Sequence, residues 1–335
     1  MMLSGRTSAL AASQKPGGAR ISATGSSSTT SADGPTRGVL ILPGLANNAA
    51  DYAGLSEHLH SRGLATKVVQ IGRPDWSRNA AALADMNWWK GTLKPRPAVD
   101  WYLQRVSAAM DELKQEVDGA PITMLCHSAG GWLGRVFMLE FGVTGIDRYI
   151  TLGSPHAPPP PGVEGVVDQT RGILNWCQDA APGAYHPEVK YVTIAGRKVK
   201  GVKLSQQGSW LAKFAGAGYQ QVCGDAEVWG DFIVPVPSAH LEGAINVDID
   251  DCFHSPLGTK LKFFGPWYGS DEMVDQWMHY VTDDWDSLQP GWYEEHADGS
   301  TTKSSSSSSS SGSGSGNTAG SSEAAPVGAG VPEQL

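Results

Sequence analysis

One serine lies in a sequence context that suits a nucleophile. The apolar run at residues 122–125 ends at Cys126, and Ser128 and Gly130 follow just before a helical pattern begins. Strand, turn and helix in this order are typical of the nucleophile elbow G-x-S-x-G, where small residues on both sides of the serine let strand and helix pass closely. Cys126 replaces the first glycine but is also small. The pattern predicts Ser128 as a nucleophile; the alternative is a serine that only caps a helix.

Two backbone N–H groups near this serine are candidates for an oxyanion hole. The N–H of Ala129 opens the expected helix, where unpaired amides and the helix dipole favour a developing negative charge. In folds with this turn, the second donor comes from the loop after an earlier strand. The strand expected at residues 38–42 is followed by Pro43, Gly44 and Leu45. We therefore expect the N–H of Leu45 to be the second donor.

A serine hydroxyl is a weak nucleophile unless a base lies beside it. Among nine histidines, His254 directly follows the last expected strand, at the sheet edge where the elbow also ends. His127 neighbours the serine in the chain and should point away from the hydroxyl. His156 begins a Pro-rich segment and is a weaker candidate. The sequence therefore predicts His254 as the base.

The carboxylate that supports this base should lie between the serine and the histidine in the chain. Asp231 lies between the last two expected strands and is followed by apolar residues that can hold its loop against the core. Asp225 and Glu227 are rivals in the same stretch, and a loop aspartate more commonly caps a turn. The order Ser128, Asp231, His254 favours Asp231.

Apolar runs and helical patterns alternate along the chain, which predicts a mostly parallel sheet with helices on both faces. Strands are expected at residues 38–42, 66–71, 122–125, 149–152, 189–195 and 244–249, and helices at 49–61, 98–118, 130–141 and 271–284. Two irregular stretches, at about residues 155–188 and 197–230, are long enough to be lids or binding loops. The predicted fold is one doubly wound α/β domain over residues 36–292 that carries two lid segments.

Composition excludes several classes of protein. The net charge of −9 leaves no basic surface for nucleic acid. No apolar run approaches the roughly 18–20 residues that span a bilayer, although peripheral contact with a membrane stays open. Four cysteines lack the spacing of a metal site or a disulfide framework, which favours a reducing compartment. We expect no metal ion in this protein.

The two ends differ from the rest of the chain. Residues 1–32 contain no acid, three basic residues and many Ser, Thr and Ala residues, which is typical of an organellar transit peptide. We expect residues 1–35 to direct the protein to the chloroplast; a mitochondrial presequence and an ordinary disordered terminus are the alternatives. The Ser/Gly-rich tail at residues 293–335 is expected to stay disordered.

These motifs resemble those of the lipase-like α/β-hydrolases, particularly plant and algal plastid members related to the GPI inositol-deacylase-like group. The matching segments are 42–44, 126–132, 151–156, 230–231, 234–235 and 254–256. The resemblance implies an α/β-hydrolase fold and ester hydrolysis through an acyl-enzyme, with no cofactor. The sequence departs from the pattern at Cys126, and at Leu42, where many relatives have histidine.

The function predicted from the sequence is a serine hydrolase that cleaves carboxylic esters. The insert at residues 76–101 is rich in tryptophan and, with the lids, favours a lipid acyl ester over a peptide, unless these tryptophans only pack against the sheet. Two other classes remain: an acyltransferase with the same three residues, and a non-catalytic ligand-binding protein on the same fold. The second would usually have lost one of the three residues, and all three are present.

Overall fold

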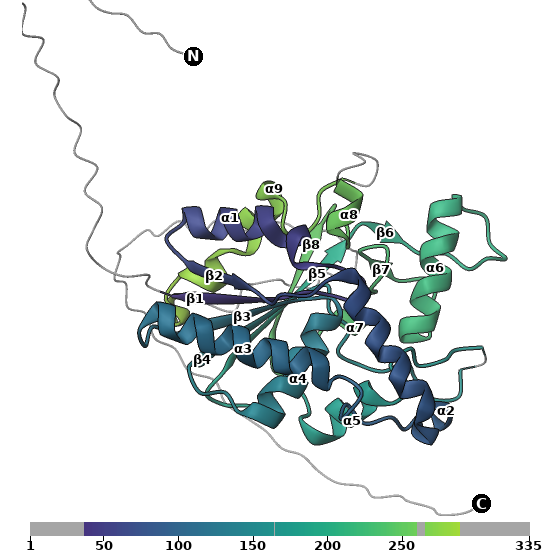
Figure 1. The fold of residues 1–335 in the computed structure, drawn as a ribbon. Helices are drawn as coiled ribbons and strands as arrows, with labels where there is room; N and C mark the ends of the chain where they lie inside the picture. The colour runs from purple at the N-terminus through teal and green to yellow at the C-terminus, as the bar shows by residue number, and fades with distance from the viewer. Residues whose placement is uncertain (1–36, 164, 260–264, 289–335) are drawn as a thin grey trace, which may run out of the picture. The chain divides into compact units, whose positions relative to one another are not determined.

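Six strands pair into one sheet in the order β2-β1-β3-β4-β5-β8, and all five pairings are parallel (Figure 1). The strands are β1 Gly38–Leu42, β2 Ala65–Val68, β3 Ile122–His127, β4 Ile146–Leu152, β5 Lys190–Arg197 and β8 Ile245–Asp250. Strands β1 and β3 are buried along their whole length, because helices cover both faces of the sheet. The fold class predicted from the sequence, an α/β domain with a mostly parallel sheet and helices on both faces, is confirmed.

The computed structural model describes residues 37–163, 165–259 and 265–288, all within one compact unit. The predicted transit peptide at residues 1–35 and the predicted tail at residues 293–335 lie outside the described residues. In the described part of the chain, no helix is both long and apolar enough to cross a membrane.

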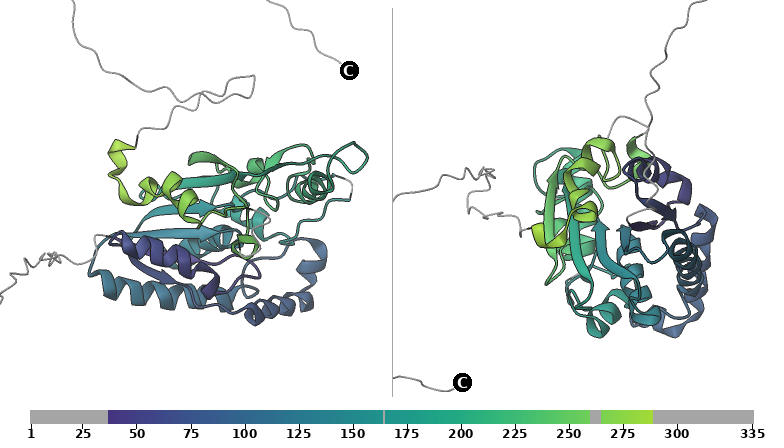
Figure 2. Two further views of the ribbon diagram at one scale, coloured as in Figure 1. Left: turned by 90° about the horizontal axis from the view of Figure 1, so that it is seen from above. Right: turned by 90° about the vertical axis from the view of Figure 1, so that its left-hand side faces the viewer.

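Helices form a layer on each face of the sheet, as Figures 1 and 2 show. One layer contains α3 Asp100–Val117, α4 Ala129–Phe141 and α5 Ile173–Ala180. The other contains α1 Ala53–Ser61, α9 Asp271–Trp277 and α10 His279–Thr282. Side chains alternate between the faces along each strand. Leu40 and Leu42 of β1 therefore pack with the first layer, and Val39 and Ile41 pack with the second.

Several predicted element boundaries are wrong; β4, for example, begins at Ile146 and not at residue 149. The strand expected at residues 66–71 ends at Val68, where its pairing with Ile41 near the end of β1 runs out. The helix expected at residues 271–284 is interrupted at Met278, which separates α9 from α10.

The segments that follow the carboxyl ends of the strands contain most of the remaining structure. After β2 come a long 3-10 helix at Arg73–Ala84 and α2 Met86–Lys90, which buries none of its residues, although Trp88 packs partly against the core. The second predicted lid contains β6 Val199–Lys200, α6 Trp210–Cys223 and β7 Trp229–Gly230. Shorter elements are 3-10 helices at Ala49–Tyr52 and Trp285–Ser287, and α7 Val236–Ala239 and α8 Pro256–Thr259.

The two predicted lid segments are joined to each other. Gln221 of α6 donates a hydrogen bond from Nε2 to the carbonyl of Gly165 at 2.8 Å, and its Oε1 accepts one from the N–H of Val167 at 3.3 Å. Neither lid is irregular throughout, since the first contains α5 and the second contains α6.

Candidate active site

Ser128 occupies a sharp turn between β3 and α4. Its φ of 53° and ψ of −127° lie outside the favoured regions for a residue with a side chain. A Cβ on Gly44 would lie 2.6 Å from the Cβ of Ser128, and a Cβ on Gly130 would collide with the carbonyl of Leu42. The turn therefore needs small neighbours, as the elbow pattern predicts.

The cysteine that replaces the first elbow glycine is accommodated by a glycine on the helix opposite. Cys126 is fully buried, and a Cβ on Gly134 of α4 would lie 3.0 Å from its Sγ. The missing side chain at Gly134 thus leaves room for the thiol at Cys126. This pairing explains why the departure from the elbow pattern leaves the strand–turn–helix geometry intact.

The three residues predicted from chain order lie in one line of hydrogen bonds. His254 Nδ1 is 2.6 Å from Asp231 Oδ2, and His254 Nε2 is 2.9 Å from Ser128 Oγ. An ionised carboxylate can only accept, so Nδ1 of His254 holds the ring proton and donates it to Asp231. The unprotonated Nε2 then accepts the hydroxyl hydrogen of Ser128. This is the arrangement in which an imidazole can remove a proton from a serine.

The carboxylate of Asp231 is fully buried, and both of its oxygens are occupied. Oδ1 accepts the N–H groups of Ile233 at 3.0 Å and Val234 at 2.7 Å. Oδ2 accepts the hydroxyl of Tyr268 at 2.8 Å as well as the ring N–H of His254. Four hydrogen bonds offset the cost of burying the carboxylate and fix its orientation.

A glycine makes room for this carboxylate. Gly153 follows β4 with φ of 55°, and a Cβ there would lie 2.5 Å from Oδ2 of Asp231 and 2.7 Å from the hydroxyl of Tyr268. Any other residue at Gly153 would therefore be strained by the backbone and would also collide with both groups.

The rival residues lie elsewhere. Asp225 is exposed, and its Oδ1 caps the N–H of Glu227 at 2.8 Å. Glu227 forms an ion pair with Lys203 and accepts a hydrogen bond from Gln206. His156 is buried, with Nε2 3.1 Å from the hydroxyl of Thr151. None of these carboxylate and imidazole groups contacts Ser128.

The loop expected to supply the second oxyanion donor lies against the elbow. Gly44 contacts the turn at Ser128, and Leu45 and Ala129 line the same cavity as Ser128 and His254. Ala129 is the first residue of α4, so its N–H has no partner within the helix. Leu45 and Ala129 therefore remain the candidates for the oxyanion hole.

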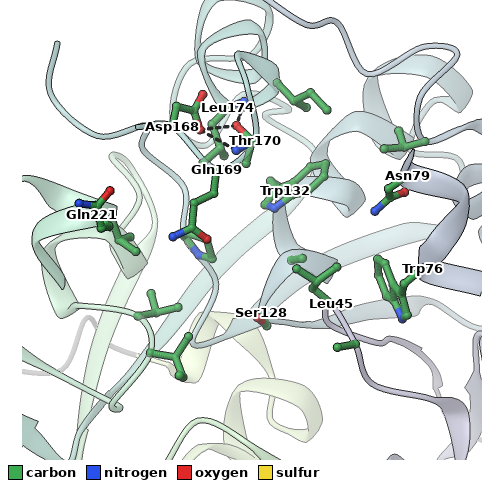
Figure 3. Close-up of a pocket in the computed structure, with 18 of the residues that line it drawn as sticks. Leu45, Trp76, Asn79, Ser128, Trp132, Asp168, Gln169, Thr170, Leu174 and Gln221 are labelled. Atoms are coloured by element: carbon green, nitrogen blue, oxygen red, sulfur yellow. Dashed lines mark hydrogen bonds between the residues drawn. The ribbon is translucent and has the colours of Figure 1, made fainter. Parts of the chain in front are cut away.

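The cavity above Ser128 has a volume of about 540 Å³ (Figure 3). Its wall is mostly apolar and comes from the insert after β2, from α4 and from both lid segments, as Trp76, Trp88, Trp132, Leu174 and Val222 illustrate. A polar group faces it from the first lid, where Gln169 extends into the cavity in Figure 3. A cavity of this size accepts a small organic molecule.

The sequence did not predict the roles of four residues near the site: Gly134, Gly153, Tyr268 and Tyr52. Tyr52 hydrogen-bonds the ring of His127 at 2.8 Å. His127 itself behaves as predicted, because its side chain is buried away from the hydroxyl of Ser128. Among the described residues, no group of three or more His, Cys, Asp or Glu side chains is arranged to hold a metal ion.

Two buried histidines make the fold sensitive to acid. Burial lowers the pKa of His127 well below 6.5. Burial likewise lowers the pKa of His156, with a contribution from the charge of Arg135. Both imidazoles are neutral in the folded protein, but they take up protons in the unfolded chain below about pH 6.5. Stability rises with pH wherever the unfolded state binds more protons.

We therefore expect the free energy of unfolding to fall as the pH drops below about 6.5 and to be level just above pH 7. Urea denaturation over this range measures it. In His156→Gln the dependence on pH should be shallower, because one of the two groups is gone. An equally steep dependence in that variant would contradict the assignment for His156.

No protein-family model matches the chain, and none of the curated proteins searched matches it. Solved structures that resemble it include a Bacillus licheniformis lipase in its mature form, with 19% identity, 69% of this chain and 90% of that chain covered, and a TM-score of 0.44. A Listeria innocua gene product has 12% identity, coverage of 74% and 94%, and a TM-score of 0.43. A dienelactone hydrolase from Anabaena variabilis has 14% identity, coverage of 74% and 88%, and a TM-score of 0.36.

Proposed function

We propose that this protein is a serine hydrolase that cleaves carboxylic esters through an acyl-enzyme. The observation that supports the proposal is the hydrogen-bonded line from Ser128 through His254 to the buried carboxylate of Asp231. The hydrogen bonds run in the direction that catalysis needs, because the unprotonated ring nitrogen of His254 faces the hydroxyl of Ser128. A serine that merely capped α4 would not need a strained backbone and an oriented imidazole.

In the proposed reaction, Ser128 Oγ attacks the ester carbonyl while His254 Nε2 takes the hydroxyl proton. The carbonyl oxygen becomes an oxyanion, which the N–H groups of Leu45 and Ala129 would stabilise. His254 then gives its proton to the departing alcohol, and the acyl group remains on Ser128. Water attacks the acyl-enzyme with His254 again as the base, and the carboxylic acid is released. Asp231 stabilises the imidazolium in both halves.

The walls of the cavity support an ester with a large apolar part. Three tryptophans, Trp76, Trp88 and Trp132, line it together with aliphatic residues. Three of the large apolar side chains that line this cavity, Leu45, Ile233 and Leu257, are also exposed to solvent. Exposed apolar side chains gathered around an apolar cavity favour lipid esters, presented at a surface, over small soluble esters.

The proposal is tested with p-nitrophenyl esters of increasing acyl length and with a fluorophosphonate probe, which forms a covalent bond with activated serines. We expect hydrolysis of medium or long acyl esters and labelling of Ser128, located by peptide mass spectrometry. Product analysis with an added alcohol separates hydrolysis from acyl transfer. Labelling of another residue, or no reaction with any ester, would contradict the proposal.

A variant at the cavity wall tests where the acyl chain lies. Ala82 is buried and lines the cavity, whereas its neighbour Ala81 is exposed and does not. In Ala82→Phe, the added ring should shorten the longest ester accepted, with kcat/KM falling about 10-fold or more for each methylene that no longer fits. Ala81→Phe is the matched control. An unchanged chain-length profile in Ala82→Phe would mean that the acyl chain lies elsewhere.

A further inference from the structure

A buried chain of hydrogen bonds lies next to the site. The proposed Ser–His–Asp set contributes only one group to it, the backbone carbonyl of His254. The hydroxyl oxygen of Tyr52 accepts the N–H of Gly44 at 2.9 Å and the amide Nδ2 of Asn47 at 3.1 Å. The same hydroxyl lies 2.8 Å from Nδ1 of His127. On the other side of the ring, Nε2 of His127 lies 2.8 Å from the backbone carbonyl of His254.

The partners of this chain fix every proton in it. The carbonyl of His254 can only accept, so Nε2 of His127 must hold the ring hydrogen. Nδ1 of the neutral ring is then an acceptor. The Tyr52 oxygen already receives two N–H groups, and it therefore directs its own hydrogen to Nδ1 of His127. Only one tautomer of His127 satisfies all four contacts.

The chain connects three parts of the site that lie far apart in the sequence. Gly44 and Asn47 flank Leu45 in the loop that would supply the second oxyanion donor. His127 precedes Ser128 at the end of β3. The carbonyl of His254 belongs to the residue whose ring is the proposed base. One pair of side chains thus holds the loop, the nucleophile strand and the base loop together.

The surroundings leave this pair little freedom. Tyr52 is fully buried, and His127 is exposed by only 1%. Trp267 packs edge-on against both rings, with centroid separations of 5.8 Å to Tyr52 and 5.6 Å to His127. Burial also lowers the pKa of His127, which keeps its ring in the neutral form that the hydrogen bonds require.

We propose that Tyr52 and His127 are positioning residues, which hold the oxyanion loop and the base loop in register around Ser128. The proposal rests on the proposed ester hydrolysis. Neither side chain touches the substrate or takes part in proton transfer. Their effect is to keep the N–H of Leu45 and the ring of His254 where the transition state needs them, a geometry in which small displacements are costly.

Tyr52→Phe tests the loop side of this chain. The variant keeps the ring packing but leaves the Gly44 N–H and the Asn47 amide without their acceptor. We expect kcat to fall about 10–100-fold with little change in KM, because the lost contact positions the transition state and not the bound ester. Tyr191→Phe is the matched control, since Tyr191 is also buried and also accepts a backbone N–H, from His186, through its hydroxyl. Equal kcat values in the two folded variants would overturn the proposal.

Two substitutions of His127 separate positioning from packing. His127→Gln keeps an amide N–H that can reach the His254 carbonyl, whereas His127→Leu fills the space but donates nothing. If His127 is a positioning residue, the Gln variant should have a clearly higher kcat than the Leu variant, even if urea denaturation shows that the Leu variant is more stable. If kcat instead follows stability, with the Leu variant equal to or above the Gln variant, His127 has only a packing role.

The tautomer is read separately by nuclear magnetic resonance of the protein with isotope-labelled histidine. His127 should be protonated at Nε2 and unprotonated at Nδ1; the opposite pattern would overturn the chain as described. This measurement needs no activity, so it distinguishes the two failures. If the wild-type protein reacts with neither ester nor fluorophosphonate, the proposed function and the proposed effect of Tyr52 and His127 on kcat are both contradicted. The spectrum would still show whether His127 has the tautomer that the hydrogen-bonded chain requires.

Discussion

Replacing Ser128 with alanine is expected to abolish ester hydrolysis while the protein stays folded. The hydroxyl lies 2.9 Å from Nε2 of His254, and the substitution removes one oxygen from a half-buried position at the cavity. Little packing is lost, so the urea midpoint should hardly move. Loss of a nucleophilic serine lowers kcat by about 10⁶-fold in a well-studied serine protease. The measurement is the rate with p-nitrophenyl esters, together with fluorophosphonate labelling.

Ser154 provides the control for this variant. It is fully buried beside the same turn, where its hydroxyl is 3.4 Å from the carbonyl of Cys126 and a Cβ on Gly131 would collide with it. Ser154→Ala removes a hydroxyl from the same neighbourhood without touching His254, and fluorophosphonate should still label this variant at Ser128. Retained esterase activity in Ser128→Ala would move the nucleophile to another residue.

The positions of Ser128, Asp231 and His254 were predictable because of a topological rule. In a parallel sheet, the carboxyl ends of the strands share one edge, so Ser128 just past β3 and His254 just past β8 lie at the same edge, and the connection from β5 to β8, which contains Asp231, begins there too. Chain order and local pattern are then enough to choose among a few candidates. The same rule explains why the insert after β2 and both lid segments line the cavity.

The residues around these three were not predictable, because their roles depend on close approaches between distant segments. Tyr268 donates to Asp231 from 37 positions away, in a segment with no recognisable pattern. Gly134 is needed because a thiol approaches it, and Gly153 because a carboxylate approaches it and its φ is positive. Tyr52 lies in an ordinary amphipathic stretch, where an apolar contact would satisfy the periodicity equally well. Such partner choices follow from tertiary packing, which spacing in one sequence does not encode.

Asp231→Asn is expected to lower kcat by about 10⁴-fold with the fold preserved, by analogy with the corresponding change in chymotrypsin-type triads. The direction follows from the hydrogen bonds. Oδ1 of Asp231 accepts two backbone N–H groups, from Ile233 and Val234, so an asparagine must keep its carbonyl oxygen on that side. Its NH₂ group then faces Nδ1 of His254. That nitrogen must give up its hydrogen, Nε2 becomes protonated, and the ring can no longer accept the proton of Ser128.

Asp225→Asn distinguishes this assignment from its rival. Asp225 is exposed, and one of its oxygens caps the N–H of Glu227. An asparagine carbonyl preserves this contact, so the kcat of Asp225→Asn should match that of the wild type. In Asp231→Asn, the same isotope-labelled histidine spectrum should show the proton of His254 moved from Nδ1 to Nε2, which ties the lost activity to the tautomer. If Asp225→Asn were the inactive variant and Asp231→Asn the active one, the acid would be misassigned. The proposed roles of Ser128 and His254 would then survive, because their contact does not depend on which carboxylate lies behind the imidazole.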